Sequence, residues 1–185
     1  MNPLPLVAVA GNPNAGKSAL FNALTGARQK VGNYPGVTVE RHSGRLTLED
    51  GRPVGLVDLP GAYSLDPASP DEAVTRDVLF GKQHGERQPD ALVIVLDASN
   101  LDNHLRFALQ LIELGLPTVV ALNMVDLARR DGLELDPEAL ERELGVPVIE
   151  TVAVRRRGIK ELHAAIDDML SAPRSTKRPP GTSGT

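Results

Sequence analysis

The sequence predicts an α/β fold with a six-stranded, mainly parallel sheet, one antiparallel edge strand and helices on both faces. Three observations predict it. A glycine-containing loop joins an apolar run to a helix-like segment near the N-terminus. Short apolar runs then alternate with amphipathic segments along the chain. The runs are apolar at nearly every position, which is typical of parallel strands that helices cover on both faces.

The first third of the chain predicts a strand, a helix and a hairpin. Residues 4–10 are apolar and are expected to form a buried strand, and residues 17–25 the first helix. Residues 26–35 are polar and contain glycine, so we expect a loop. Residues 37–48 and 54–57 flank the turn sequence Glu-Asp-Gly-Arg, which predicts two paired strands.

The middle of the chain alternates loops, helices and strands. Residues 58–70 hold three prolines and a glycine and predict a loop. A helical pattern follows over 70–82, with acidic residues in its first turn. Residues 91–96 are a continuous apolar run, 102–114 have an amphipathic helical pattern that ends before a glycine, and 117–122 are again an apolar strand.

The last third predicts two helices, one strand and a tail. Helices are expected over 137–144 and 159–170, with a strand over 146–149. We therefore expect one domain over residues 1–170. Residues 171–185 are rich in Pro, Ser, Thr and Gly and lack large apolar side chains, so we expect a disordered linker or tail.

Composition excludes several classes of protein. The net charge of −4 has no basic half, which argues against nucleic acid as the main partner. There is no cysteine, so neither a disulfide nor a thiolate site is expected. No stretch reaches the roughly 20 apolar residues of a membrane span, and the N-terminus lacks the basic start of a secretory signal. The chain is expected to be cytoplasmic.

The loop after the first strand has the spacing of a phosphate-binding P-loop. Backbone N–H groups of such a loop cradle phosphate oxygens. Lys17 would reach the β- and γ-phosphates, and the Ser18 hydroxyl would bind Mg²⁺. The alternative is an ordinary turn between strand and helix. The expected nucleotide-binding residues here are Gly11, Asn12, Pro13, Asn14, Ala15, Gly16, Lys17, Ser18 and Ala19.

Two further stretches predict contacts to the γ-phosphate and to Mg²⁺. In the first, Asp58, Leu59, Pro60 and Gly61 follow a strand. The Asp58 carboxylate could hold a Mg²⁺-bound water, and the Gly61 N–H could reach the γ-phosphate. The alternative is a strand-terminating aspartate in a Pro-Gly turn.

The second stretch is Gly36, Val37 and Thr38. Thr38 could add a second hydroxyl ligand to Mg²⁺ when the triphosphate is bound, which would make this loop a switch. The alternative is a β-branched residue in a strand.

Two stretches predict which base is bound. Asp126, in the sequence Asn123-Met124-Val125-Asp126, could accept hydrogen bonds from N1–H and the exocyclic amine of guanine, which adenine does not offer in that pattern. Asn123 is expected to brace this loop against the P-loop. The alternative is a turn in which Asp126 caps a helix. A weaker signal follows the last strand, where the backbone of Val152, Ala153 and Val154 could meet the guanine O6.

Together these stretches are the five signatures of the small-GTPase fold. The sequences VGNYPGVTVE, DLPGAYSL and NMVD resemble the G domain of the ferrous-iron transport protein B (FeoB) family, over about residues 4–170. The resemblance implies that Asn14 helps to hold K⁺, with carbonyls at Gly32 and Tyr34. It makes Asn14, Lys17, Thr38 and Gly61 the catalytic residues.

The resemblance also implies parts outside this chain. In the family a helical regulatory region and a membrane permease follow the G domain, at the cytoplasmic face of the inner membrane, and nucleotide-dependent self-association is implied.

The sequence departs from the family pattern at two places that affect the chemistry. Position 62 is Ala, where a water-orienting glutamine is usual, and Ala153 and Val154 replace a serine-containing motif. The second departure predicts weaker guanine contacts and faster nucleotide release.

The sequence thus predicts a domain that binds GTP or GDP and hydrolyses GTP slowly, with Mg²⁺ and with K⁺ as activator. One alternative is a nucleotide-gated switch with negligible turnover, and another is a ribosome- or tRNA-associated GTPase. The four histidines, including His104, are expected to be surface or half-buried residues with no metal role.

Overall fold

The computed structural model describes residues 4–26 and 28–171. The predicted tail over 171–185 lies outside these residues except for Ser171, which ends the last helix. No helix within the described ranges has both the length and the apolar character needed to cross a membrane.

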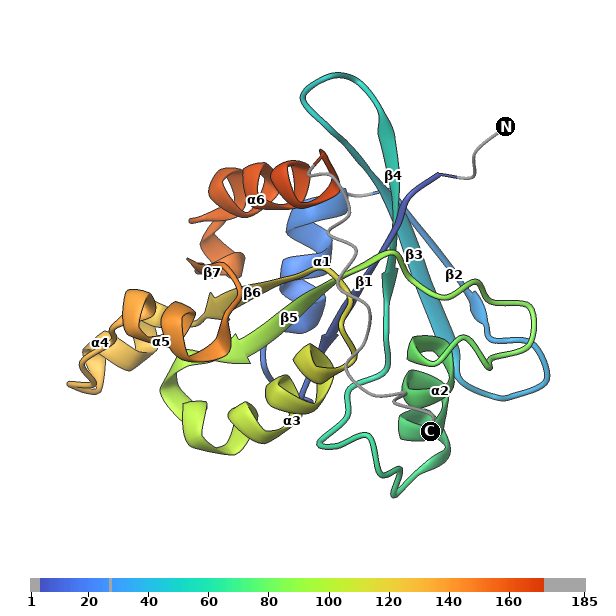
Figure 1. The fold of residues 1–185 in the computed structure, drawn as a ribbon, viewed down its shortest axis with the longest axis horizontal. Helices are drawn as coiled ribbons and strands as arrows, with labels where there is room; N and C mark the ends of the chain where they lie inside the picture. The colour runs from blue at the N-terminus through green and yellow to red at the C-terminus, as the bar shows by residue number, and fades with distance from the viewer. Residues whose placement is uncertain (1–3, 27, 172–185) are drawn as a thin grey trace, which may run out of the picture.

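The described residues form one seven-stranded sheet between two layers of helices (Figure 1). The strands are β1 Leu6–Gly11, β2 Gln29–Asn33, β3 Glu40–Thr47, β4 Pro53–Asp58, β5 Ala91–Asp97, β6 Thr118–Asn123 and β7 Val148–Glu150. The α-helices are α1 Lys17–Thr25, α2 Pro70–Leu79, α3 Leu101–Glu113, α4 Val125–Arg130, α5 Pro137–Leu144 and α6 Ile159–Ser171. Two 3₁₀ turns are η1 Ala98–Asn100 and η2 Ala153–Arg155.

The sheet is mainly parallel, as predicted. Its order is β2-β3-β4-β1-β5-β6-β7. Strands β4, β1, β5, β6 and β7 pair in parallel, whereas β2–β3 and β3–β4 are antiparallel. The sequence predicted six strands and a loop over residues 26–35. Both predictions were wrong at one place, because part of that segment forms a seventh strand, β2. This strand pairs only with β3 and is mostly exposed, so its sequence carries no burial pattern.

Alternate residues of the central strands face opposite helix layers. Val7 and Val9 of β1 belong to the core that includes Phe21 of α1 and Leu162 of α6. Ala8 of β1 belongs to the other core, which takes in side chains from α2, α3, α4 and α5. Figure 1 shows α1 and α6 together on one face of the sheet. Both strand faces are therefore buried, which explains the continuous apolar runs.

Local signals explain where the predicted helices begin and end. The Ser69 side chain accepts from the N–H of Glu72 at 3.2 Å and caps α2. The Asp136 side chain accepts from Ala139 N at 3.0 Å and caps α5, which ends at Gly145 in the left-handed conformation. The short helix α4 was not predicted, because six residues are too few to display a helical period.

Parallel pairing brings the loops of interest to one edge of the sheet. Loops that follow β1, β4, β6 and β7 all leave from the carboxyl ends of adjacent or nearby strands. In open α/β sheets this edge is where ligands bind. Four of the five predicted stretches, those after β1, β4, β6 and β7, therefore lie at the same edge of the sheet. The fifth, residues 36–38, lies in the turn of the β2–β3 hairpin.

The loop after β7 depends on a glycine that can be tested. Gly158 has a φ of +77°, and an added Cβ atom would overlap the carbonyl oxygen of Glu150. Gly132 has a φ of +78° with nothing within 4 Å. We expect Gly132→Ala to lower the unfolding free energy by about 1 kcal/mol through backbone strain, and Gly158→Ala by about 3 kcal/mol. Urea denaturation measures both, and equal losses would contradict the overlap.

Candidate functional site

The loop between β1 and α1 has a backbone conformation suited to anion binding. Asn14 and Gly16 both have left-handed backbone angles, with φ of 70° and 81°. Gly16 is the N-cap of α1, and no side chain caps this helix. The N–H groups of its first turn therefore face the loop without a side-chain partner. A helix N-terminus of this kind attracts phosphate through its N–H groups and dipole.

Neighbouring elements hold the loop in place on two sides. The buried Asn12 side chain donates from Nδ2 to the carbonyl oxygen of Asn103 on α3 at 3.2 Å. The N–H of Ala62 donates to the carbonyl of Gly11 at 3.2 Å. An added Cβ atom on Gly61 would lie 3.1 Å from the backbone nitrogen of Pro13. The loop after β4 thus packs directly on the P-loop, and a side chain at position 61 would push the two loops apart by a few tenths of an ångström.

The Asn123 side chain joins three loops. Its Nδ2 donates to the carbonyl of Ala15 at 3.1 Å. Its Oδ1 accepts from the Thr151 hydroxyl and from the N–H of Ala153, both at 3.0 Å. A Cβ atom on Gly16 would overlap Asn123 Nδ2, so glycine is needed there as well. The prediction that Asn123 braces its loop against the P-loop is confirmed.

Thr151 was missed by the sequence reasoning. It is a buried residue that directly follows β7, and its N–H donates to the carbonyl of Leu122 at 2.8 Å. The signal in the sequence was a polar residue placed between an apolar strand and the predicted base-binding stretch. Its hydroxyl donates to Oδ1 of Asn123 and so fixes the orientation of the amide in which Nδ2 points to the P-loop.

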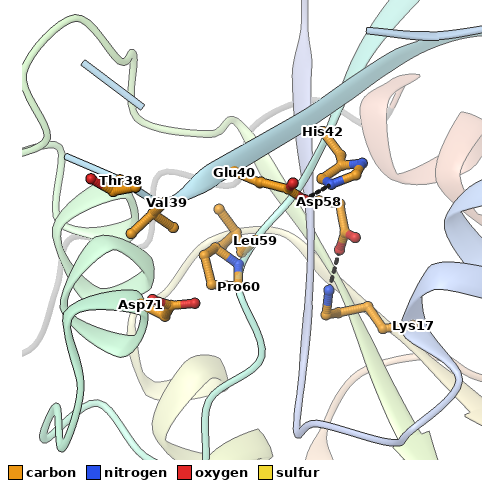
Figure 2. A pocket seen from close by; sticks show the side chains of 9 residues that line it. All are labelled: Lys17, Thr38, Val39, Glu40, His42, Asp58, Leu59, Pro60 and Asp71. Carbon is orange, nitrogen blue, oxygen red and sulfur yellow. Dashed lines mark hydrogen bonds and ion pairs between the residues drawn. The ribbon is translucent and has the colours of Figure 1, made fainter. Parts of the chain in front are cut away.

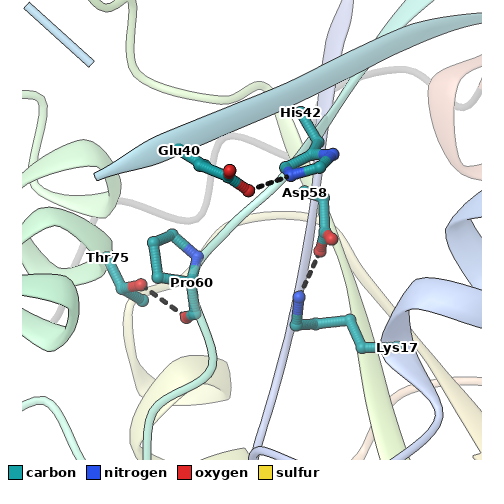
Figure 3. A network of polar contacts seen from close by, with 6 residues as sticks. All are labelled: Lys17, Glu40, His42, Asp58, Pro60 and Thr75. Carbon is teal, nitrogen blue, oxygen red and sulfur yellow. Dashed lines mark hydrogen bonds and ion pairs between the residues drawn. The ribbon is translucent and has the colours of Figure 1, made fainter. Parts of the chain in front are cut away.

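Lys17 and Asp58 form an ion pair at the centre of the site (Figure 3). Both side chains are only 11% exposed. Burial raises the pKa of the Asp58 carboxyl, and the Lys17 ammonium opposes that rise. A buried charge of either sign would be costly alone, so each of these groups needs the other or a ligand of matching charge.

A pocket of about 350 Å³ opens beside this ion pair (Figure 2). Figure 2 shows Thr38 and Asp71 on one side and Lys17 with Asp58 on the other. The pocket therefore brings together residues from α1, the β2–β3 hairpin and the loop after β4. Its lining residues are Lys17, Thr38, Val39, Glu40, His42, Asp58, Leu59, Pro60 and Asp71.

Side-chain contacts fix two sides of this pocket. The Thr75 hydroxyl of α2 donates to the carbonyl of Pro60 at 2.7 Å. His42 and Glu40 of β3 lie 3.0 Å apart between Nε2 and Oε2. Oxygen ligands of the kind that Mg²⁺ prefers are thus present on both sides of the pocket, from Asp58 and from Thr38. Ser18 is exposed in the first turn of α1 and does not line the pocket.

The segment that carries Thr38 is the tip of the β2–β3 hairpin. The N–H of Tyr34 donates to the carbonyl of Val39 at 2.9 Å, and the N–H of Val37 donates to the carbonyl of Tyr34 at 3.3 Å. Gly36, Val37 and Thr38 are exposed. The alternative in which Thr38 is a strand residue is wrong, since β3 begins at Glu40.

The residues expected to surround K⁺ lie on two segments, the P-loop and the β2–β3 hairpin. Asn14 is exposed on the P-loop. Gly32 pairs with Arg41 in the β2–β3 ladder, and the Tyr34 carbonyl accepts from Val37. Neither Gly32 nor Tyr34 lines the pocket beside Lys17.

The two stretches expected to bind the base lie after β6 and β7. Met124 has a φ of 62° and is the N-cap of α4, with Asp126 half-buried in the first turn. The alternative in which Asp126 caps a helix is wrong, because no side chain caps α4. Val152 and Ala153 are buried, whereas Val154 is 80% exposed.

One histidine differs from its prediction. His104 is only 4% exposed, because the face of α3 that carries it packs against β5. Its Nδ1 accepts from the N–H of Asp97 at 3.5 Å, and burial lowers its pKa while the Asp97 carboxylate opposes this. Within residues 4–26 and 28–171, no three His, Cys, Asp or Glu side chains group as a metal site would require.

Comparison with known proteins decides the family. Residues 6–166 match the family model described as "Ferrous iron transport protein B". The chain belongs to the FeoB family. The ribosome- and tRNA-associated alternative therefore loses its support.

FeoB relatives match both the sequence and the fold. The Fe(2+) transporter FeoB of Salmonella typhimurium is 47% identical over 166 residues, which cover 87% of this chain and 21% of the relative. The cytosolic domain of L. pneumophila FeoB is 43% identical with a TM-score of 0.81, covering 89% of this chain and 68% of that one. A mutant of S. thermophilus NFeoB bound to GDP is 40% identical with a TM-score of 0.80, covering 90% and 63%. The chain thus spans about a fifth of the length of its curated FeoB relatives.

Tyr34 provides a test of packing beside the site. Its side chain is 1% exposed, and its hydroxyl has no hydrogen-bond partner among the described residues. Burying an unpaired hydroxyl costs about 1–3 kcal/mol. We therefore expect Tyr34→Phe to raise the unfolding free energy by about 1 kcal/mol, measured by thermal or urea denaturation.

The matched control is Tyr63→Phe, because Tyr63 is 60% exposed and its hydroxyl can bond to water. That variant is expected to leave stability unchanged. A loss of stability in Tyr34→Phe would mean that the buried hydroxyl has a partner such as an ordered water.

Proposed function

We propose that this chain is a GTP-binding and slowly GTP-hydrolysing regulatory domain of a bacterial ferrous iron transporter. The observation that carries the proposal is the Asn123 side chain, which bonds both the P-loop and the loop after β7. This contact fixes a phosphate-binding loop and a base-binding loop relative to each other, as a nucleotide site requires. A related FeoB domain binds GDP, which supports the same ligand here.

The phosphate end of the site suits a nucleoside triphosphate with Mg²⁺. Lys17 and the N–H groups of the P-loop would bind the β- and γ-phosphates. Ser18, Thr38 and Asp58 would hold Mg²⁺, which supplies charge neutralisation when bound. The donor set fits, because hydroxyl and carboxylate oxygens flank a pocket with Lys17 on its wall. The Gly61 N–H would reach the γ-phosphate from the loop packed on Pro13.

The base end of the site suits guanine. The Asp126 carboxylate would accept two hydrogen bonds from guanine, whereas adenine would leave it unpaired. Backbone groups of Val152, Ala153 and Val154 would border the base, with Met124 beside them. Both GTP and GDP would be ligands.

Slow hydrolysis follows from the contacts of Ala62. Its side chain cannot orient a water molecule, and its N–H already donates to the carbonyl of Gly11. Neither the side chain nor the N–H of Ala62 would therefore assist hydrolysis. Other groups must stabilise the negative charge that develops on the phosphates. Asn14, exposed on the P-loop, would help to hold K⁺ together with the Gly32 and Tyr34 carbonyls. Catalysis would consist of positioning and charge stabilisation.

The remaining partners lie in the rest of a longer protein. The curated FeoB relative is about five times as long as the matched region. We propose that a helical regulatory region and a membrane permease follow, that the domain works at the cytoplasmic face of the inner membrane, and that nucleotide binding promotes self-association. The iron itself would be the cargo of the permease.

Potassium activation can be tested directly. We expect replacing Na⁺ by K⁺ to raise the GTP turnover number about tenfold, equivalent to about 1.4 kcal/mol of barrier. Asn14→Ala is expected to remove that gain, because it loses the side-chain ligand. Phosphate release at fixed ionic strength is the measurement.

The control is Asn22→Ala, which changes an exposed asparagine of α1 whose side chain accepts a hydrogen bond from Gln29. This variant should keep the potassium effect. Equal wild-type rates in Na⁺ and K⁺ would remove the role of K⁺.

The Asn123 bridge predicts a kinetic effect of Thr151. Thr151→Val removes one buried hydrogen bond to Asn123 Oδ1, worth about 1–1.5 kcal/mol. We expect a fluorescent GDP analogue to leave about tenfold faster, because such losses act mainly on dissociation. Thr118→Val is the control, since its buried hydroxyl bonds to the Leu116 carbonyl at 2.8 Å away from the site. Equal release rates in the two variants would count against the bridge.

A further inference from the structure

The tip of the β2–β3 hairpin rests on the connector between α2 and β5. Arg41, near the start of β3, forms a two-point contact with Glu86 of that connector. Its Nε lies 2.5 Å from Oε1 of Glu86, and its Nη2 lies 3.3 Å from Oε2. The Glu86 side chain is 8% exposed and that of Arg41 is 29% exposed. This burial makes the pair much less screened than a surface ion pair.

A second contact lies on the other side of the tip. An added Cβ atom on Gly85 would be 3.0 Å from Cγ of Pro35. Gly85 has a φ of +74°, a conformation that favours glycine. The connector thus turns sharply so that its backbone lies against Pro35 while the next residue binds Arg41.

The Tyr34 side chain lies beneath the same region. It belongs to the core that includes Val74 and Val78 of α2. Burial raises the pKa of the Tyr34 hydroxyl, the Glu86 carboxylate adds to this rise, and the Arg41 guanidinium opposes it. The ion pair and the phenol ring are therefore close enough to act on each other.

These contacts bracket Thr38 on both sides. Tyr34 and Pro35 come before Thr38, and Arg41 follows it. Tyr34 belongs to the core cluster that includes α2 side chains, whereas Pro35 and Arg41 contact the connector after α2. For residues 36–39, the described hydrogen bonds are the two backbone bonds that join Val37 and Val39 to Tyr34. The exposed Thr38 makes no described side-chain hydrogen bond, so its position is set by the anchored ends of the tip.

We propose that Glu86 is a positioning residue for Thr38. By holding Arg41, with Pro35 against Gly85, it keeps the hairpin tip where Thr38 lines the pocket that contains Lys17 and Asp58. Glu86 itself does not line that pocket. The inference rests on the proposed GTP hydrolysis, because Thr38 matters to catalysis only if a Mg²⁺-bound triphosphate enters the pocket.

The proposal predicts a selective effect on the triphosphate state. Diphosphate binding depends on the P-loop and the guanine loops, which Glu86 does not contact in the described structure. Glu86→Gln keeps the size of the side chain but removes its charge, so the tip loses its ionic anchor. We expect the GTP turnover number to fall about tenfold and the Mg²⁺ concentration for half-maximal hydrolysis to rise, while GDP release changes less than twofold.

The experiment compares four variants of the 185-residue chain with the wild type. They are Glu86→Gln, Arg41→Gln, the double charge swap Arg41→Glu with Glu86→Arg, and Asp50→Asn. The last breaks the exposed ion pair of Arg52 with Asp50 at the β3–β4 turn and serves as control. Each variant is assayed for GTP turnover in K⁺ with varied Mg²⁺, for release of fluorescent GDP, for binding of a non-hydrolysable GTP analogue, and for thermal unfolding.

The outcomes separate the positioning role from the alternatives. The proposal predicts that both single Gln variants lose turnover and analogue affinity, that the swap regains at least half of the lost turnover, and that Asp50→Asn behaves as wild type. Unchanged turnover in Glu86→Gln would overturn it. So would a parallel loss of GDP retention, or a swap that restores thermal stability without restoring turnover.

The proposed function can fail separately. A wild-type chain that neither retains GDP nor hydrolyses GTP would refute the proposed function and this inference with it. A wild-type chain that does both, with a normal Glu86→Gln variant, would refute only the inference.

Discussion

The side-chain amide of Asn123 is the contact on which the rest of the site depends. It lies at the carboxyl end of a central strand and is buried, so each of its polar atoms must find a partner inside the protein. It finds them on the P-loop and on the loop after β7. Because an amide has distinct donor and acceptor ends, this bridge also fixes the direction in which the two loops face. Gly16 makes the bridge sterically feasible.

The ion pair of Lys17 and Asp58 organises the other end of the site electrostatically. Each group is mostly buried and compensates the other. A ligand with several negative charges and a bound cation can replace both halves of this pair, since it offers charge of each sign. The proposed metal-bound phosphate group would match this charge pattern, and the match would depend on the burial of the two side chains as well as on their charges.

Much of this arrangement could be predicted from the sequence because it depends on local patterns. The P-loop spacing, the capped helix α5 and the apolar strands each carry their signal within a few residues. The alternation of strands and helices then predicted a mainly parallel sheet, whereas the strand order came only from the structure. The strand β2 could not be predicted, since an exposed edge strand has no apolar pattern to display. The burial of His104 likewise depends on which face of α3 meets β5.

The contacts that could not be predicted are those between residues distant in sequence. Thr151 and Asn123 are 28 positions apart, and Arg41 and Glu86 are 45 positions apart. Asn123 lies in a predicted stretch, but Thr151, Arg41 and Glu86 lie in none of them. Each of these three residues meets its polar partner only because the topology brings the two together. Arg41 and Glu86 would separately be assigned to the solvated surface.

The position of β2 at the edge of the sheet has a consequence for the energetics of local opening. A central strand must break ladders on two sides to move, whereas β2 is tied only to β3. Amide hydrogens of the hairpin tip should therefore exchange with solvent through small fluctuations, while those of β1 and β5 exchange only when the whole domain unfolds. If the hairpin tip rearranges with the nucleotide as proposed, the residues that move would lie in a region that opens easily, and the P-loop would stay fixed by its attachment to the central strand β1.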